Sequence, residues 1–206
     1  MDSLFIDKPM DKLVIDIETK NTFADVGGQE NIKDLQVSFV GLYSYNKDQY
    51  LSFYENELDK LGPILKNAGL VIGFSINRFD IPVLEKHCDF NIYALSRLDL
   101  LEEIEMALGH RISLDILAKT NLGIGKTHHS LEAIKLYKDG NLEELKNYCL
   151  NDVKITKDLY ELAKKNGHLL VPSKTSPAFA KASSGKPEIL KARFNWREQI
   201  LPSTLF

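Results

Sequence analysis

The sequence contains little cysteine and no long hydrophobic run. Its 206 residues include two cysteines, Cys88 and Cys149, too few for a thiolate metal site and typical of a reducing compartment. No apolar run approaches the roughly 20 residues that span a bilayer. The first twelve residues carry acids and lack the apolar core of a secretory signal. The composition therefore predicts a cytoplasmic protein without a membrane partner.

The sequence also has no excess of positive charge. The formal net charge is −3, which argues against binding of nucleic acid through bulk positive charge. The segment from residue 171 onward contains six Lys or Arg residues and two Glu residues, so this tail carries a charge of +4 and the first 170 residues carry −7. An acidic body still allows a nucleic-acid enzyme, because bound divalent cations cancel a cluster of carboxylates locally.

The order of apolar patterns predicts an α/β domain with a mixed β-sheet flanked by helices. Residues 1–170 form this domain, and residues 171–206 form a basic tail rich in Pro, Ser, Ala and Lys, partly disordered, whose last part can dock as a short element. Loops are expected at 20–33 and 121–129. The expected strands are 13–17, 37–45, 50–54 and 70–74, and the expected helices are 57–67, 79–87, 98–108, 114–120, 131–137 and 142–165.

Two acids interrupt the first strand. Asp16 and Glu18 are two residues apart, so a strand directs both carboxylates to one face. Two carboxylates on one buried face repel each other unless a cation lies between them, and Mg²⁺ or Mn²⁺ prefers such oxygen ligands. The alternative is an exposed strand edge with both acids in water.

Two later segments carry further acids. Asp80 follows a buried strand and a short turn, at the start of a helix, where it serves either as a metal ligand or as a helix cap. Tyr148 and Asp152 are four residues apart, on one face of the long helix, and that face is otherwise apolar. They form either part of a site or a core tyrosine beside a helix-edge acid.

The three segments together resemble a known family. Residues 16–19 read Asp-Ile-Glu-Thr, residues 73–84 read Gly-Phe-Ser-Ile-Asn-Arg-Phe-Asp-Ile-Pro-Val-Leu, and residues 148–153 read Tyr-Cys-Leu-Asn-Asp-Val. Their order and spacing resemble the DEDD exonuclease superfamily in its tyrosine-bearing (DEDDy) branch. They are most similar to the proofreading 3′–5′ exonuclease domain of family-B DNA polymerases and its stand-alone relatives. The resemblance runs from about residue 13 to residue 165.

This resemblance implies a ribonuclease H-like fold, a single-stranded DNA or RNA substrate and two divalent cations, Mg²⁺ or Mn²⁺. The implied product is a nucleoside 5′-monophosphate, released from a 3′ end. Tyr148 is expected to orient the attacking water, since a phenol with a pKa near 10 is a poor base at neutral pH. The implied metal ligands are Asp16, Glu18, Asp80 and Asp152. The implied substrate contacts are Thr19, Ser75, Asn77 and Phe79, with Ser75 standing where many relatives have asparagine.

Other interpretations remain open. The chain is alternatively a catalytically weak nucleic-acid binding module, or a subunit that tethers a replication or repair complex through its tail. The terminal Leu205-Phe206 is similar to peptides that dock on bacterial sliding clamps, although Pro202 occupies the position of their usual glutamine. Folding of this end back onto the domain is the favoured expectation, and weak contact of the tail lysines with a nucleic-acid backbone is a third. Cys149 is expected to be a small packed residue rather than a nucleophile.

Overall fold

A five-stranded mixed sheet forms the centre of the protein. The computed structural model describes residues 10–124, 130–173 and 189–194. The strand order is β3-β2-β1-β4-β5, with β2 antiparallel to β1 and β3, and with β4 parallel to β1 and β5. The strands are β1 (Asp11–Thr19), β2 (Val37–Ser44), β3 (Gln49–Tyr54), β4 (Ala68–Gly73) and β5 (Arg97–Asp99). This architecture confirms the expected mixed sheet.

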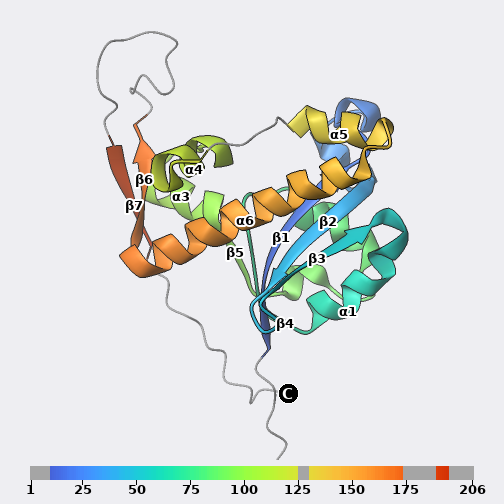
Figure 1. Ribbon diagram of the computed structural model, residues 1–206, viewed down its shortest axis with the longest axis horizontal. Helices are drawn as coiled ribbons and strands as arrows, with labels where there is room; N and C mark the ends of the chain where they lie inside the picture. The colour runs from blue at the N-terminus through green and yellow to red at the C-terminus, as the bar shows by residue number, and fades with distance from the viewer. Residues whose placement is uncertain (1–9, 125–129, 174–188, 195–206) are drawn as a thin grey trace, which may run out of the picture.

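Helices cover both faces of the sheet, and the long helix α6 crosses one of them (Figure 1). The α-helices are α1 (Leu61–Lys66), α2 (Asp80–Leu84), α3 (Leu100–Leu108), α4 (Leu114–Leu122), α5 (Ser130–Lys138) and α6 (Leu142–Asn166). Short 3-10 helices span Ala24–Val26, Gln29–Asp34, Glu55–Lys60, Glu85–His87 and Ile92–Ala94.

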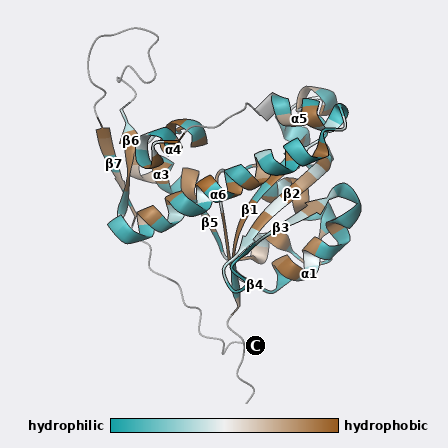
Figure 2. Cartoon of the chain, viewed as in Figure 1, coloured by the Kyte–Doolittle hydropathy of each residue, from teal (hydrophilic) through white to brown (hydrophobic). Residues whose placement is uncertain are grey.

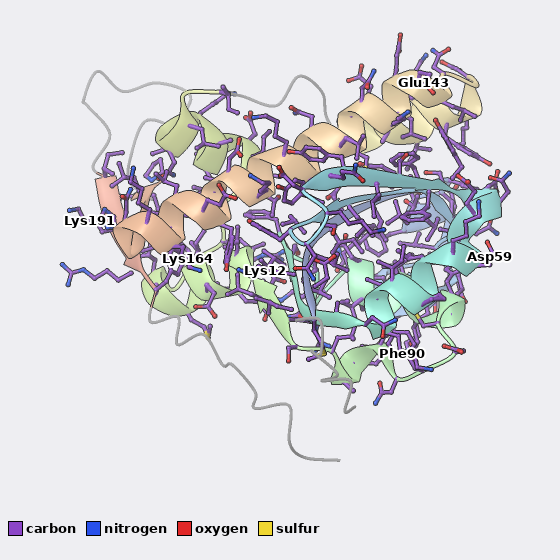
Figure 3. All side chains as sticks on the ribbon, turned by 60° about the horizontal axis from the view of Figure 1, so that its bottom comes forward. Lys12, Asp59, Phe90, Glu143, Lys164 and Lys191 are labelled. Carbon is purple, nitrogen blue, oxygen red and sulfur yellow. The ribbon has the colours of Figure 1, made fainter. Side chains whose placement is uncertain are left out.

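The two faces of β1 have different neighbours because its side chains alternate. Leu13, Ile15 and Ile17 pack in one core with residues of α1 and α2. Val14 packs on the opposite face with residues of α3, α4 and α6. Brown hydrophobic segments lie along the sheet, and charged side chains such as those of Glu143 and Lys164 lie at the periphery (Figures 2 and 3). The even-numbered residues of β1 therefore face α6.

Several element boundaries differ from the sequence expectations. The helix expected at 57–67 is a 3-10 helix followed by α1, and the one expected at 79–87 is α2 followed by a 3-10 helix. The helix expected at 98–108 begins at Leu100, because 97–99 form the edge strand β5 and Asp99 caps α3. The loop expected at 20–33 contains two 3-10 helices. These elements are too short to produce a clear hydrophobic period.

A second sheet lies beyond the end of α6. It pairs β6 (His168–Pro172) antiparallel with β7 (Ile189–Arg193), and β7 also contacts α3 (Figure 1). The domain boundary expected at residue 170 thus falls inside β6, and a short element of the tail docks on the domain. The expected disorder of 172–187 and the docking of 195–206 concern residues mostly outside the described ranges. Within the described ranges, no helix has the length and apolar character needed to cross a membrane.

Candidate active site

The site begins at the contact between α6 and the middle of the sheet. Gly41 of β2 pairs with Asp16 of β1. A Cβ atom on Gly41 would lie 3.0 Å from Cys149 Sγ and 3.1 Å from Val153 Cγ2, so a side chain here would push α6 away. Glycine allows the close approach, and it brings the first half of α6 onto the face of β1 that carries the acids.

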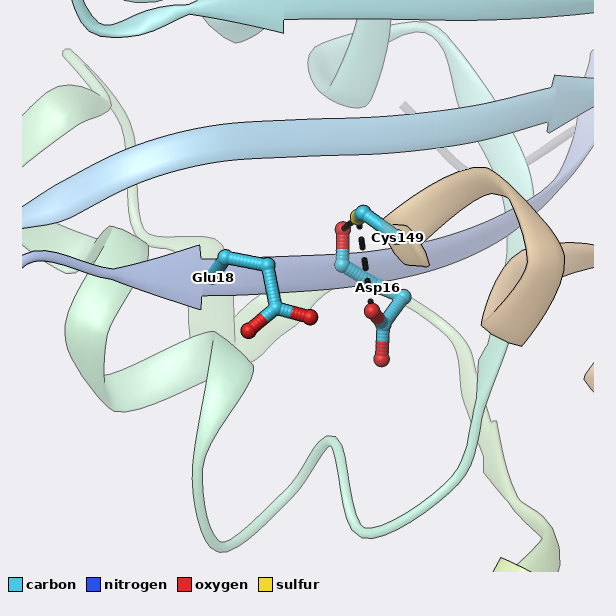
Figure 4. A group of neighbouring side chains, drawn as sticks. All are labelled: Asp16, Glu18 and Cys149. Atoms are coloured by element: carbon cyan, nitrogen blue, oxygen red, sulfur yellow. Dashed lines mark hydrogen bonds between the residues drawn. The ribbon is translucent and has the colours of Figure 1, made fainter. Parts of the chain in front are cut away.

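Asp16 and Glu18 share that face, as their spacing predicts, and both carboxylates project to the same side of β1 (Figure 4). One oxygen from each, together with Cys149 Sγ, forms a group whose atoms all lie within 4.8 Å of one another. The Cys149 thiol donates to the Asp16 backbone carbonyl at 3.3 Å and to Asp16 Oδ2 at 3.4 Å. Burial and the neighbouring carboxylates raise the pKa of this thiol well above its usual range, so it remains a hydrogen-bond donor.

Tyr148 and Asp152 of α6 face the same acids. Both are buried, and the side chain of Asp152 is only 3% exposed. Burial raises the pKa of the Tyr148 hydroxyl, and the charges of Glu18, Asp152 and Asp16 raise it further. Three carboxylates therefore act on one phenol, which stays protonated at neutral pH. Asp152 is therefore not a solvated acid at the edge of the helix.

Asp80 approaches from the other side of β1, at the first residue of α2. Its side chain is 4% exposed, and its Oδ1 atom has no hydrogen-bond partner. Burial raises the pKa of this carboxyl well above its ordinary value, and the charges of Asp16 and Asp99 raise it further. Backbone hydrogen bonds from Asp80 itself and from Ile17 offset only part of this effect. Ionised Asp80 is therefore destabilised by its surroundings unless a cation is nearby.

The donor set suits a hard divalent cation. The side chains offer carboxylate oxygens, one of them buried without a partner, and Mg²⁺ and Mn²⁺ prefer such ligands. Asp16 and Glu18 lie in the tight group, whereas Asp80 and Asp152 lie outside it. The charge of Asp16 raises the pKa of Asp80, and the charges of Glu18, Asp152 and Asp16 raise the pKa of Tyr148, so Asp80 and Asp152 lie near this group.

The fold agrees with comparisons to known proteins. The family model of the RNase H superfamily matches residues 13–164. The chain belongs to the RNase H superfamily. A comparison with curated proteins found no match.

Among solved structures, this RNase H superfamily member is similar to the family B DNA polymerase from the hyperthermophilic archaeon Pyrobaculum calidifontis. The TM-score is 0.59 at 17% sequence identity, over 76% of this chain and 25% of the polymerase chain. At this identity the likeness shows the fold alone. The chain spans about a quarter of the polymerase's length.

The expected substrate contacts lie in different local settings. The Thr19 hydroxyl donates to the Asn21 carbonyl, and the Asn77 amide donates to Glu102 Oε2 at 2.7 Å while accepting from Arg97 Nε at 2.7 Å. Thr19 and Asn77 thus make bonds within the protein. The substrate roles of all four expected residues stay predictions.

The other two expected contacts, Ser75 and Phe79, are placed differently. The ring of Phe79 packs edge-on against Phe23 at a centroid separation of 6.0 Å. The Ser75 hydroxyl accepts from the exposed guanidinium of Arg111 at 3.3 Å. This contact adds a cation beside the turn that carries the second motif.

Sequence reasoning missed two residues near the site, Asp99 and Arg111. Asp99 had a recognisable signal, because an aspartate directly before an apolar-periodic segment is typical of a helix N-cap. Arg111 had none, since its approach to Ser75 depends on tertiary structure. Cys149 was expected to pack as a small residue, and the structure confirms that it is buried.

Two hollows of the described surface lie elsewhere. One, of about 510 Å³, is lined by Tyr54, Glu55 and Tyr137 among others, and the second, of about 200 Å³, by residues that include Lys20 and Lys86. The four acids line neither of them.

Proposed function

We propose that this RNase H-like protein is a metal-dependent 3′–5′ exonuclease of the DEDDy type, acting on single-stranded nucleic acid, DNA more than RNA. The observation that supports the proposal is the group formed by Asp16 and Glu18 on β1, with buried Asp80 of α2 influenced by the charge of Asp16 and buried Asp152 of α6 acting on Tyr148.

The four acids would hold two divalent cations, whose combined charge of +4 balances four carboxylates. When bound, such ions activate water and stabilise the leaving oxygen of an in-line phosphoryl displacement. Asp16 is the shared ligand in this proposal, because the electrostatic effects of the site centre on it. The Cys149 thiol holds Asp16 in place through its hydrogen bond to Oδ2.

Tyr148 would hold the attacking water. Its raised pKa keeps the hydroxyl protonated, so it acts through a hydrogen bond and not as a general base. Arg111, exposed and in contact with Ser75, would bind a phosphate of the substrate strand. Removal of successive nucleotides from the 3′ end would release nucleoside 5′-monophosphates.

The proposed setting is the cytoplasm, which fits two free cysteines, Cys88 and Cys149. Docking of the tail on a replication or repair partner stays a prediction. The structure changes how it should be tested, since a deletion from residue 172 would remove the strand β7 that pairs with β6. A truncation after Phe194 leaves both strands intact.

A polarity assay tests the proposed activity. Single-stranded DNA and RNA oligonucleotides, labelled at the 5′ or the 3′ end, are incubated with Mg²⁺, Mn²⁺ or chelator. A 3′–5′ exonuclease gives a descending ladder from 5′-labelled strands and labelled mononucleotide at once from 3′-labelled strands. Binding without cleavage in every metal condition would instead support the alternative, a nucleic-acid binding or tethering subunit.

A further inference from the structure

Asp99 occupies an unusual position between two structural elements. It is the last residue of β5 and the N-cap of α3, and it is 3% exposed. Its Oδ1 atom accepts from the backbone N–H groups of Leu101 at 3.0 Å and Glu102 at 3.4 Å, which is ordinary helix capping. The same carboxylate also accepts two bonds from a different part of the chain.

Those two bonds come from the turn that leads to Asp80. Asp99 Oδ1 accepts from Ser75 N–H at 2.8 Å, and Oδ2 accepts from Asn77 N–H at 3.0 Å. Burial raises the pKa of Asp99, although backbone N–H groups lower it in part. A buried carboxylate that accepts four backbone N–H bonds is held far more rigidly than a surface cap requires.

The turn needs such an anchor. A Cβ atom on Gly73 would lie 1.9 Å from Ile76 Cγ2, so the chain folds back tightly at the end of β4. Ser75 has a φ of +69°, a left-handed conformation that is costly for a residue with a side chain. Contacts around Ser75 must therefore stabilise this conformation. One of them is the hydrogen bond from the Ser75 N–H to Asp99.

Arg97 strengthens the same attachment. It lies two residues before Asp99, on the same face of β5, and its Nε donates to the Asn77 side chain. Its other contacts are backbone carbonyls, including that of Tyr93 at 2.8 Å. Two residues of β5 therefore bond to Asn77. Asp99 accepts from its backbone N–H, and Arg97 donates to its side chain.

We propose that Asp99 is a positioning residue for Asp80. By fixing the turn of residues 75–79, it sets the start of α2 and keeps the Asp80 carboxylate buried beside Asp16. The proposal rests on the proposed function for its effect on turnover, but its effect on cation binding does not require that the protein cleave anything.

Asp99→Ser is the informative variant. A serine hydroxyl still caps α3 but is too short to reach the turn with a second oxygen. We expect the Mn²⁺ concentration that gives half of the metal-induced rise in melting temperature to increase about 10- to 100-fold, the usual effect of losing a group that orients a metal ligand. Amide exchange at Ser75 and Asn77 should accelerate. On oligonucleotides kcat should fall with KM unchanged.

Ser113→Ala is the matched control. Ser113 caps α4 through the N–H of Ile116 at 3.3 Å, so its loss removes a helix cap elsewhere. The control should lower the melting temperature without moving the Mn²⁺ midpoint. An equal shift in both variants would show general destabilisation and overturn the proposal.

Asp99→Asn carries the test if the serine variant does not fold. An asparagine retains the three bonds to Oδ1 and replaces Oδ2 with a donor that faces the N–H of Asn77. Its Mn²⁺ midpoint should lie between those of the wild type and the serine variant. A wild-type midpoint in either Asp99 variant would contradict the assigned role. If the wild type binds Mn²⁺ but does not degrade oligonucleotides, the proposed function is refuted. The Mn²⁺ midpoints of the Asp99 variants still test the role of Asp99 in that case.

Discussion

A variant in which Asp16 is neutral should be more stable than the wild type without metal and less stable than the wild type with metal. Asp16 and Glu18 contribute oxygens to a group within 4.8 Å, and both carboxylates are partly buried. Two unit charges at that distance repel by about 1 kcal/mol in water and about 3 kcal/mol at the effective dielectric of a protein surface. The variant Asp16→Asn keeps the shape of the side chain and an oxygen for the Cys149 thiol.

The expected sign therefore reverses with metal. In chelator, relief of about 1–3 kcal/mol should raise the melting temperature by about 2–12 °C for a protein of this size. A cation at 100 times its dissociation constant stabilises the wild type by about 2.7 kcal/mol, and the variant should lose most of that gain. Thermal melts in chelator and across a Mn²⁺ titration measure both effects.

A variant on α6 supplies the control. Asp158 forms an ion pair with Lys154 at 2.7 Å. Asp158→Asn should lower stability by less than about 1 kcal/mol, as exposed ion pairs do, and leave the metal response unchanged. If Asp16→Asn melts below the wild type in chelator, the carboxylates of Asp16 and Glu18 do not repel each other in the folded protein. If Mn²⁺ raises the melting temperature of the variant as much as that of the wild type, Asp16 does not bind the cation.

Three further predictions concern other parts of the molecule. Tyr148→Phe should reduce turnover by roughly 10- to 1000-fold with metal binding retained, the scale of losing one positioned group, and a wild-type rate would mean that only the ring matters. Because the folded-state pKa of Asp80 is raised, its proton binds more tightly in the folded state. The metal-free wild type should therefore melt below Asp80→Asn at pH 7, and the gap should close as the pH falls toward the unfolded pKa of about 3.9; a constant gap would refute this. Truncation after Phe194 should lower the melting temperature if the end docks on the domain, whereas docking on a sliding clamp predicts only loss of clamp-dependent activity. The truncation removes no lysine, so replacement of Lys174, Lys181 and Lys186 by alanine tests the third expectation and should weaken low-salt oligonucleotide binding if the tail lysines contact the backbone.

The sequence predicted the long elements and the shared face of Asp16 and Glu18 well, for physical reasons. β1 and α6 have strong apolar periods, and the structure ends α6 at Gly167, which has a left-handed conformation. Alternation along β1 was enough to place Asp16 and Glu18 on one face. The spacing of Tyr148 and Asp152 likewise put both on the buried face of α6.

The remaining features depend on tertiary contacts that no local pattern reports. β5 has three residues, and β6 and β7 are separated by sixteen positions, so neither pairing has a local turn signal. The side-chain amide of Asn77 bonds to Glu102 and Arg97, which approach it only after β5 pairs with β4. The second role of Asp99 could not be predicted for the same reason.

The most direct test of the central claim is metal-titrated digestion of a 5′-labelled single-stranded DNA oligonucleotide by wild type and Asp152→Asn, with melting curves to show that both are folded. Asp152 is buried and acts on Tyr148 electrostatically, so it belongs to the group of acids from which the activity is inferred. The account predicts stepwise shortening from the 3′ end by the wild type in Mg²⁺ or Mn²⁺, none in chelator, and none by the folded variant. Equal digestion by both proteins, or digestion that persists in excess chelator, would contradict it.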